Sequence, residues 1–350
     1  FTDGAFPNLG QAVWMGQNAV DILTEHVANN PGNDDFATDL ARAQMFNGLI
    51  LMVTGEIQED MTFSDKQEDG APVGPAGMAA VLDRAITNLD AAVAGFAALG
   101  DSDREMNARA LRARAHMSRA IWDELNPTAT VGGPIAYPAA LADANAVIAG
   151  TGGDWQFNLS YSESSGSCGM CSNVNSRGEN QWDVSLVENT GPGATGRTGV
   201  VTLIDPHTGA PDLSVARALA QWGDDQYGDL TISSVRLMRL ILAENDLATG
   251  GGGAGSVFET QINAIRDLDD SSAGYDFTSG GAVSDVAALQ HARRVHTLHM
   301  GLRLQDMYRW GITDPLWQSG GQAVTNPGEM LPITIIECRA NSLIDASTCS

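Results

Sequence analysis

Basic residues are scarce in this chain of 350 residues. It has 19 Lys and Arg residues against 43 Asp and Glu residues, which gives a formal net charge of −24 at pH 7. A surface this acidic repels the phosphates of nucleic acids and anionic lipid headgroups. We therefore expect no nucleic-acid partner and no polybasic membrane docking. The charge either keeps the protein soluble or serves to bind divalent cations, calcium above all, at carboxylate clusters.

Aromatic side chains and long apolar segments are also in short supply. Aromatic residues make up 6% of the chain although hydrophobic residues reach 43%, because alanine and leucine fill many apolar positions. This composition favours helices that pack closely through small side chains. No apolar run of ~18 residues occurs, so no transmembrane helix is expected. The chain begins at Phe1, without an initiator methionine or a signal peptide, as a mature or trimmed product does.

Cysteine occurs only at Cys168, Cys171, Cys338 and Cys349. The first two form a Cys-x-x-Cys motif in a segment rich in glycine and serine, and the last two lie near the C-terminus. Two local disulfides, which imply an oxidising compartment, are the simplest interpretation. A zinc site built from both pairs and a redox-active Cys-x-x-Cys motif remain alternatives.

The common motifs of catalysis are missing. The chain has no Gly-x-Ser-x-Gly nucleophile turn and no Walker loop. A chain with so many acidic residues has neighbouring carboxylates by chance alone. Such pairs therefore do not indicate the paired carboxylates of a glycosidase. We therefore predict that the protein is not an enzyme, with a hydrolase as the weakest of the alternatives.

Two features could bind a metal ion. Residues 223–229 place oxygen ligands in a loop, as calcium sites do, with Asp224, Asp225 and Asp229 as the candidate ligands. His296 and His299 lie three residues apart on a predicted helix, but the glutamate of a His-Glu-x-x-His motif is missing. We expect no cofactor, with calcium as the one candidate, and we interpret the histidines as structural.

Apolar residues recur with the period of a helix over much of the chain. The clearest example is residues 78–98, where apolar side chains fall on one face. Within residues 1–150, segments of this kind are separated by breakers such as the Asn-Asn-Pro-Gly-Asn sequence at residues 29–33, which predicts pairs of antiparallel helices. We predict a mainly all-α fold of stacked, TPR-like helical hairpins.

Residues 151–212 interrupt this pattern. Glycine, serine, asparagine and threonine dominate there, and an irregular segment this long is usually functional or an insertion. The helical pattern then returns, and its last long helix is predicted from about Asp285 to Trp310. We divide the chain into a TPR-like half (1–150), a loop-rich insertion (151–212) and a C-terminal helical part with an extended tail (213–350), all within one compact unit.

Four motifs follow one another in the C-terminal part of the chain. Residues 235–245 and 262–266 are followed by residues 291–311, in which the notable positions are Gly301, Arg303, Asp306, Arg309 and Gly311. The fourth motif is Leu331-Pro332-Ile333, followed by Glu337 and Asn341. Together they resemble the motifs of the SusD/RagB family of outer-membrane nutrient-binding proteins, including Glu-Gly-x-Arg-x-x-Asp-x-x-Arg-x-Gly and Leu-Pro-Ile-Pro-x-x-Glu-x-x-x-Asn. The resemblance implies the TPR-like helical scaffold of that family.

The resemblance also suggests where ligand contacts lie. In the family they lie on loops between the two helical parts, which here correspond to the irregular region with Trp155, Tyr161 and Trp182. Their rings could stack on the apolar face of a sugar, or they could be buried anchors of the insertion. Arg303, Asp306 and Arg309, spaced three apart, are expected to form a polar ridge that braces the chain that follows.

The function that the resemblance implies is non-catalytic. The protein would sit on the bacterial outer-membrane surface or be extracellular, capture a glycan or peptide nutrient, and pass it to a TonB-dependent transporter of the SusC type. The alternative is a structural subunit that assembles with copies of itself into an extracellular fibre or surface layer.

Overall fold

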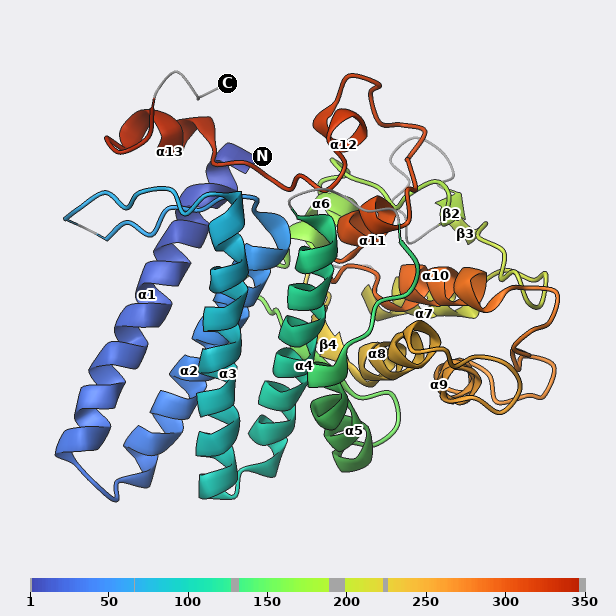
Figure 1. Ribbon diagram of the computed structural model, residues 1–350, viewed down its shortest axis with the longest axis horizontal. Helices are drawn as coiled ribbons and strands as arrows, with labels where there is room; N and C mark the ends of the chain where they lie inside the picture. Colours follow the sequence, from blue (N-terminus) through green and yellow to red (C-terminus); the bar gives the residue numbers. More distant parts are fainter. Residues whose placement is uncertain (1, 66, 127–131, 189–198, 223–225, 346–350) are drawn as a thin grey trace. The chain divides into compact units, whose positions relative to one another are not determined.

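The computed structural model describes the whole chain except residues 1, 66, 127–131, 189–198, 223–225 and 346–350 (Figure 1). The described residues are mainly helical, which confirms the predicted fold class. They form two units, one of residues 1–133, 139–150 and 304–350 and the other of residues 134–138 and 151–303. The division at residues 150 and 212 that we drew from the sequence remains a prediction.

Helical hairpins build the first unit. Its long helices stand side by side in Figure 1 and each packs on the next: α1 (Thr2–Asn29), α2 (Asp34–Ile57), α3 (Met78–Leu99) and α4 (Ser102–Leu125). The shorter α5 (Leu141–Gly150) packs on α4. Asn33 starts α2 by accepting hydrogen bonds from two backbone N–H groups, and Asp101 starts α4 in the same way with one. Short 3-10 turns cover Pro75–Gly77 and Pro138–Ala140.

The apolar face predicted for residues 78–98 is the centre of this unit. Its buried residues are Met78, Val81, Leu82, Ala85, Leu89, Ala92, Val93 and Phe96. Two glycines of α2 allow α3 to come close: a Cβ at Gly48 would lie 2.6 Å from Leu89 Cγ, and one at Gly55 would lie 2.6 Å from Leu82 Cγ. Any larger residue at these positions would force the helices apart.

A buried ion pair connects α2 with α4. Arg114 donates from Nε to Glu56 Oε1 at 2.9 Å and from Nη2 to Glu56 Oε2 at 2.7 Å. The Ser118 hydroxyl donates to the same Glu56 Oε1 at 2.6 Å. Both charged side chains are almost fully buried. Each charge therefore replaces the interactions with water that the other has lost.

The C-terminal tail contains short helices joined by extended segments. The helices are α11 (Arg303–Arg309), α12 (Gln322–Thr325) and α13 (Ile335–Ala340). Between the last two, Leu331 pairs with the end of α2: its N–H donates to the Ile57 carbonyl at 3.0 Å, and its carbonyl accepts from the Glu59 N–H at 2.9 Å. The Tyr308 hydroxyl of α11 donates to the Glu329 carbonyl at 3.0 Å, so α11 contacts the tail that follows it.

The second unit combines helices with two small antiparallel sheets. Its helices are α6 (Gly169–Asn175), α7 (Leu213–Trp222), α8 (Val235–Ala248), α9 (Val257–Arg266) and α10 (Asp285–His296). Strand β1 (Gln156–Leu159) pairs with β4 (Leu230–Ser234), and β2 (Val187–Glu188) pairs with β3 (Val200–Val201). Helix α8 packs on α9 and α10, and α10 also packs on α7.

The prediction of one long helix from about Asp285 to Trp310 is wrong. Helix α10 ends at His296 and α11 begins at Arg303, with a turn at residues 297–302 between them. The Thr297 hydroxyl donates back to the Arg293 carbonyl at 2.6 Å. His299 and Gly301 then adopt φ angles of 64° and 79°, a left-handed conformation that ends a helix.

Within the described part of the chain, no helix is both long and apolar enough to cross a bilayer.

Candidate ligand-binding site

A cavity in the described part of the second unit has a volume of about 380 Å³. Its walls come from α6, the segment around Trp182, the end of α7 and the turn between α10 and α11. A volume of this size lies within the range of ~300–1,000 Å³ that small-molecule sites occupy. The cavity therefore has room for a saccharide-sized ligand.

Three rings form one wall of this cavity. The His299 ring stacks on Trp222, with ring centroids 3.7 Å apart and an angle of 22° between the planes. Trp182 meets His299 edge-on at 4.6 Å and Trp222 at 5.5 Å. Both tryptophans are largely buried, and all three residues line the cavity. We refer to these three residues as the aromatic wall.

The backbone of His299 is what places its ring there. Among the described residues other than glycine, His299 alone has a positive φ. Such a conformation costs about 1–2 kcal/mol for a residue with a Cβ, so the surrounding structure must hold it in place. Stacking on Trp222 supplies part of that stabilisation. Burial lowers the pKa of His299 to about 3, so the ring is neutral at any physiological pH.

The Cys168–Cys171 disulfide holds a helix that contributes to the lining of the same cavity. The bridge is present and confirms the predicted local pairing. Both cysteines are buried in the same apolar cluster as Trp182 and Trp222, and Cys168 caps the N-terminus of α6. From this short helix Val174 and the exposed Met170 face the cavity. The disulfide thus stabilises a helix that is too short to be stable alone.

Charged side chains stand beside the apolar surface. Arg294, Arg303 and Asp183 all line the cavity. Asp183 accepts from the Ser185 N–H at 2.8 Å and from its hydroxyl at 2.6 Å, and Arg294 donates to the same hydroxyl. Burial alone would raise the pKa of Asp183, but the Ser185 hydrogen bonds and the two arginines outweigh it and lower the pKa. Asp183 is therefore a carboxylate at neutral pH.

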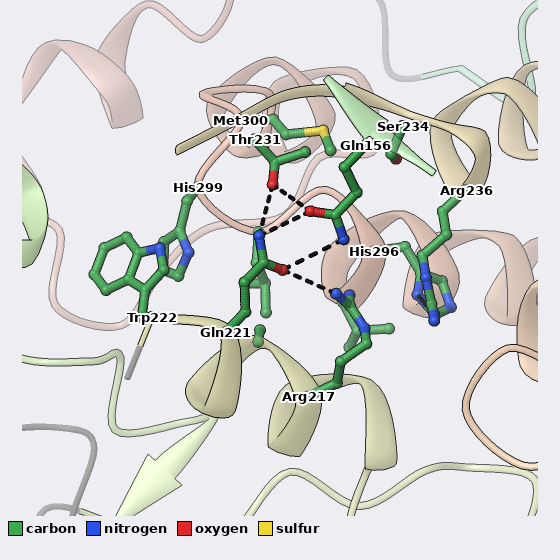
Figure 2. Close-up of a pocket in the computed structure, with 13 residues that line it drawn as sticks. Gln156, Arg217, Gln221, Trp222, Thr231, Ser234, Arg236, His296, His299 and Met300 are labelled. Atoms are coloured by element: carbon green, nitrogen blue, oxygen red, sulfur yellow. Dashed lines mark hydrogen bonds between the residues drawn. The ribbon is translucent and has the colours of Figure 1, made fainter. Parts of the chain in front are cut away.

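Behind the aromatic wall, a hydrogen-bonded network fixes the end of α7. Figure 2 shows Gln221 of α7 joined to Gln156 of β1, Thr231 of β4 and Arg217. The Gln221 amide donates to Gln156 Oε1 at 2.8 Å and to the Thr231 hydroxyl at 2.9 Å. This network lines a separate cavity of about 20 Å³, which is room for about one water molecule. Because Trp222 directly follows Gln221, the network holds the stacked ring in position.

The three aromatic residues proposed as ligand contacts lie in different places. Trp182 lines the large cavity, and Tyr161 packs against the apolar cluster behind it. Trp155 does not line the cavity: it is half-buried at the start of β1, where its carbonyl accepts from the Val235 N–H at 3.0 Å. Sequence reasoning did not single out Trp222, and it interpreted His299 as a structural histidine on the predicted helix from about Asp285 to Trp310.

The predicted polar ridge is divided between two environments. Arg309 donates from Nε to Asp306 Oδ1 at 2.9 Å, and both side chains are buried. The guanidinium of Arg309 also lies over the Trp310 ring, and its carbonyl accepts from the Gly132 N–H. Arg303, in contrast, lines the cavity.

Other predicted sites are described only in part. Asp224, Asp225 and Cys349 lie outside the described residues, so the calcium loop and the second disulfide remain predictions. Asp229 accepts from the Asn158 side-chain amide at 3.4 Å, and Cys338 is buried on α13. Within the described ranges, no group of three or more His, Cys, Asp or Glu side chains is placed to hold a metal ion.

Comparison with solved structures relates this architecture to one group of proteins. No protein-family model and no curated protein sequence matches the chain. A SusD superfamily protein from Bacteroides thetaiotaomicron superposes with a TM-score of 0.58 at 14% identity, covering 96% of this chain and 83% of the other. A SusD superfamily protein from Bacteroides fragilis gives 0.53 at 15%, covering 93% and 80%. A laminarin-binding SusD-like protein gives 0.51 at 12%, covering 98% and 85%. The chain therefore has the SusD-like fold, as the motifs of its C-terminal part predicted.

Proposed function

We propose that this protein is a non-catalytic, SusD-like receptor that binds a glycan in the cavity beside the aromatic wall. The observation that carries the proposal is the cavity of about 380 Å³ lined by Trp182, Trp222 and His299 in a chain with this fold. One of the similar structures is a laminarin-binding protein. Aromatic faces suit the C–H faces of pyranose rings, and neighbouring polar groups bind the hydroxyls.

We further propose that the protein works at the bacterial outer-membrane surface and passes its ligand to a TonB-dependent transporter of the SusC type. The SusD-like fold supports this proposal by analogy of fold. Co-purification of the transporter with the tagged protein from outer membranes tests it, and recovery of the protein free of any such channel would count against it. Assembly into a fibre, the alternative drawn from the sequence, remains a prediction that electron microscopy of the purified protein can test.

Two tryptophan substitutions test the binding site. Trp182→Ala removes a ring of the aromatic wall, whereas Trp155→Ala removes a ring of the same size outside the cavity. Isothermal titration with a panel of oligosaccharides should show binding by the native protein and by Trp155→Ala. Binding by Trp182→Ala should be about two- to tenfold weaker, since ring contacts contribute about 0.5–1.5 kcal/mol.

Because Trp182 is largely buried, Trp182→Ala could lose binding simply by misfolding. A second variant with exposed substitutions distinguishes these two causes. Asn180 and Gln181 line the cavity and are exposed to solvent, so Asn180→Ala/Gln181→Ala should leave the thermal unfolding midpoint unchanged. We expect this variant to bind glycan more weakly as well. Equal binding by all the variants would remove the cavity as the site.

A further inference from the structure

The lining of the cavity beside the aromatic wall changes in character from one element to the next. The segment at residues 180–183 contributes three polar side chains together with Trp182. Helix α6 contributes two described residues to the lining, Met170 and Val174, and both are apolar. Because they are four residues apart, they lie on one face of the helix. We refer to these two residues as the α6 patch.

The two residues of the α6 patch differ in how the folded chain covers them. Val174 is 6% exposed and belongs to the apolar cluster that contains both tryptophans of the aromatic wall. Met170, in contrast, is 46% exposed although it lines the cavity. The Cys168–Cys171 disulfide holds the helix that carries it. Folding therefore leaves an apolar side chain at a fixed place beside the cavity, where a ligand can cover it.

An unsubstituted sugar suits the α6 patch poorly. Nearly every ring carbon of a hexose carries a hydroxyl, and a hydroxyl buried against aliphatic side chains loses its hydrogen bonds to water without replacement. The aromatic wall can take the C–H face of the ring, and the polar side chains at residues 180–183 can bind its hydroxyls. The α6 patch can do neither. It favours apolar atoms, and each buried methyl or methylene group strengthens binding about fourfold.

We propose that the preferred ligand is an O-acylated glycan, whose sugar ring packs on the aromatic wall while the acyl group of its ester packs on Met170 and Val174. This inference rests on the proposed glycan-binding function and names the class of substrate. Methionine suits such a contact, because its flexible and polarisable side chain adapts to the shape of an apolar group. Asn180 and Gln181 bind the hydroxyls that are not esterified.

The test compares matched forms of neutral oligosaccharides by isothermal titration. Fragments of laminarin, xylan and mannan are each used in unsubstituted, partially O-acetylated and partially O-benzoylated form. For at least one of these backbones, an acylated form should bind the native protein at least about fourfold more tightly than the unsubstituted form. The acetyl and benzoyl forms distinguish a small aliphatic acyl group from an aromatic one.

Substitutions of Met170 test the contact itself. Met170→Gln keeps the length of the side chain but makes its end polar, so the preference for the acylated form should fall to about twofold or less. Binding of the unsubstituted form and the thermal unfolding midpoint should stay as in the native protein. Met170→Leu remains apolar and should keep the preference. Met15→Gln is the matched control, since Met15 is 53% exposed on α1 and is outside the described lining of the cavity.

A variant of the polar lining separates the two parts of the proposed contact. Asn180→Ala/Gln181→Ala should weaken the acylated and unsubstituted forms by the same factor and so keep the preference. If every oligosaccharide that binds does so equally in all its forms, or if Met170→Gln keeps the native preference, the inference fails and the glycan-binding proposal stands. If no oligosaccharide binds in any form, the proposed function fails and the inference with it.

Discussion

Glu59 should make the stability of the first unit depend on pH. It follows the C-terminal end of α2, where the tail pairs through Leu331. The Gln322 amide of the tail donates both to Glu59 Oε2 at 3.3 Å and to Glu329 Oε2 at 3.1 Å. Burial, followed by repulsion from Glu329 and Asp60, raises the pKa of Glu59 from 4.5 to about 7.

The sign of the effect follows from the two protonation states. In the unfolded chain Glu59 ionises near pH 4.5, whereas in the folded protein it keeps its proton up to about pH 7. Between these values the unfolded state binds fewer protons than the folded state, so the free energy of unfolding falls as the pH rises. Below pH 4.5 Glu59 is protonated in both states and does not lower the free energy of unfolding. Above pH 7 Glu59 is ionised in both states, and the free energy of unfolding is lowered by the full amount.

The magnitude can be worked from the same shift. At full strength the shift corresponds to about 3 kcal/mol, but Glu59 is partly solvated and screening reduces this to about 1–2 kcal/mol. Glu59→Gln removes the charge and keeps an oxygen that can accept from Gln322. We therefore expect the variant to be about 1–2 kcal/mol more stable than the native protein at pH 8 and equally stable at pH 4.5.

Urea unfolding followed by circular dichroism at pH 4.5, 6 and 8 measures this difference. Glu25→Gln on the exposed surface of α1 removes the same charge and is the control for the change in net charge. A stability difference between Glu59→Gln and the native protein that stays constant across this pH range would refute the reasoning. So would a Glu59→Gln variant that is less stable at pH 8.

Three further substitutions test the packing and the strain described above, each by urea unfolding. Arg114→Met leaves Glu56 buried without its partner and should lower the free energy of unfolding by about 3–5 kcal/mol. Glu56→Leu/Arg114→Met should recover most of this stability. A double variant that is as unstable as the single one would contradict this explanation. Gly55→Ala drives a Cβ into Leu82 and should cost about 1–3 kcal/mol, in contrast to Gly152→Ala, where no atom lies within 4 Å. His299→Val should be less stable than His299→Gly by about 1–2 kcal/mol, because valine must adopt the left-handed conformation that glycine adopts freely; the reverse order would show that this backbone conformation is not strained.

The helical hairpins could be predicted from the sequence because their signals are local. One face of α3 carries eight apolar residues that recur with the helical period, and all eight are buried. Gly48 and Gly55 of α2 mark the positions where Leu89 and Leu82 of α3 approach closely. The helical period of apolar residues, the helix-breaking residues and the small residues are all visible in short segments of the sequence. They can therefore be recognised without knowledge of distant contacts.

The cavity could be predicted only in part, because it depends on contacts between distant segments. Trp182 stood out as an aromatic residue in an irregular segment. Trp222 did not, since a tryptophan at the end of an amphipathic helix is ordinarily a core residue. Its partner His299 is 77 positions away, and the network that fixes α7 joins Gln221 to Gln156, 65 positions earlier. Pairings at such separations leave no periodic signal.

The interrupted helix shows how one wrong prediction conceals a site. Residues 291–311 contain apolar residues at helical spacing, so helix propensity alone continues α10 into α11. One local and one tertiary contact override this propensity. The Thr297 hydroxyl donates to the Arg293 carbonyl four residues earlier, and stacking on Trp222 stabilises His299 in a conformation that a helix excludes. Arg303, Asp306 and Arg309 all lie on α11, spaced three apart. Arg303, at the first position of this helix, lines the cavity, whereas Asp306 and Arg309 pair in the interior of the first unit. The turn before α11 also contributes His299 and Gly301 to the lining of that cavity, and a continuous helix from residue 285 could not hold these two residues in their left-handed conformation.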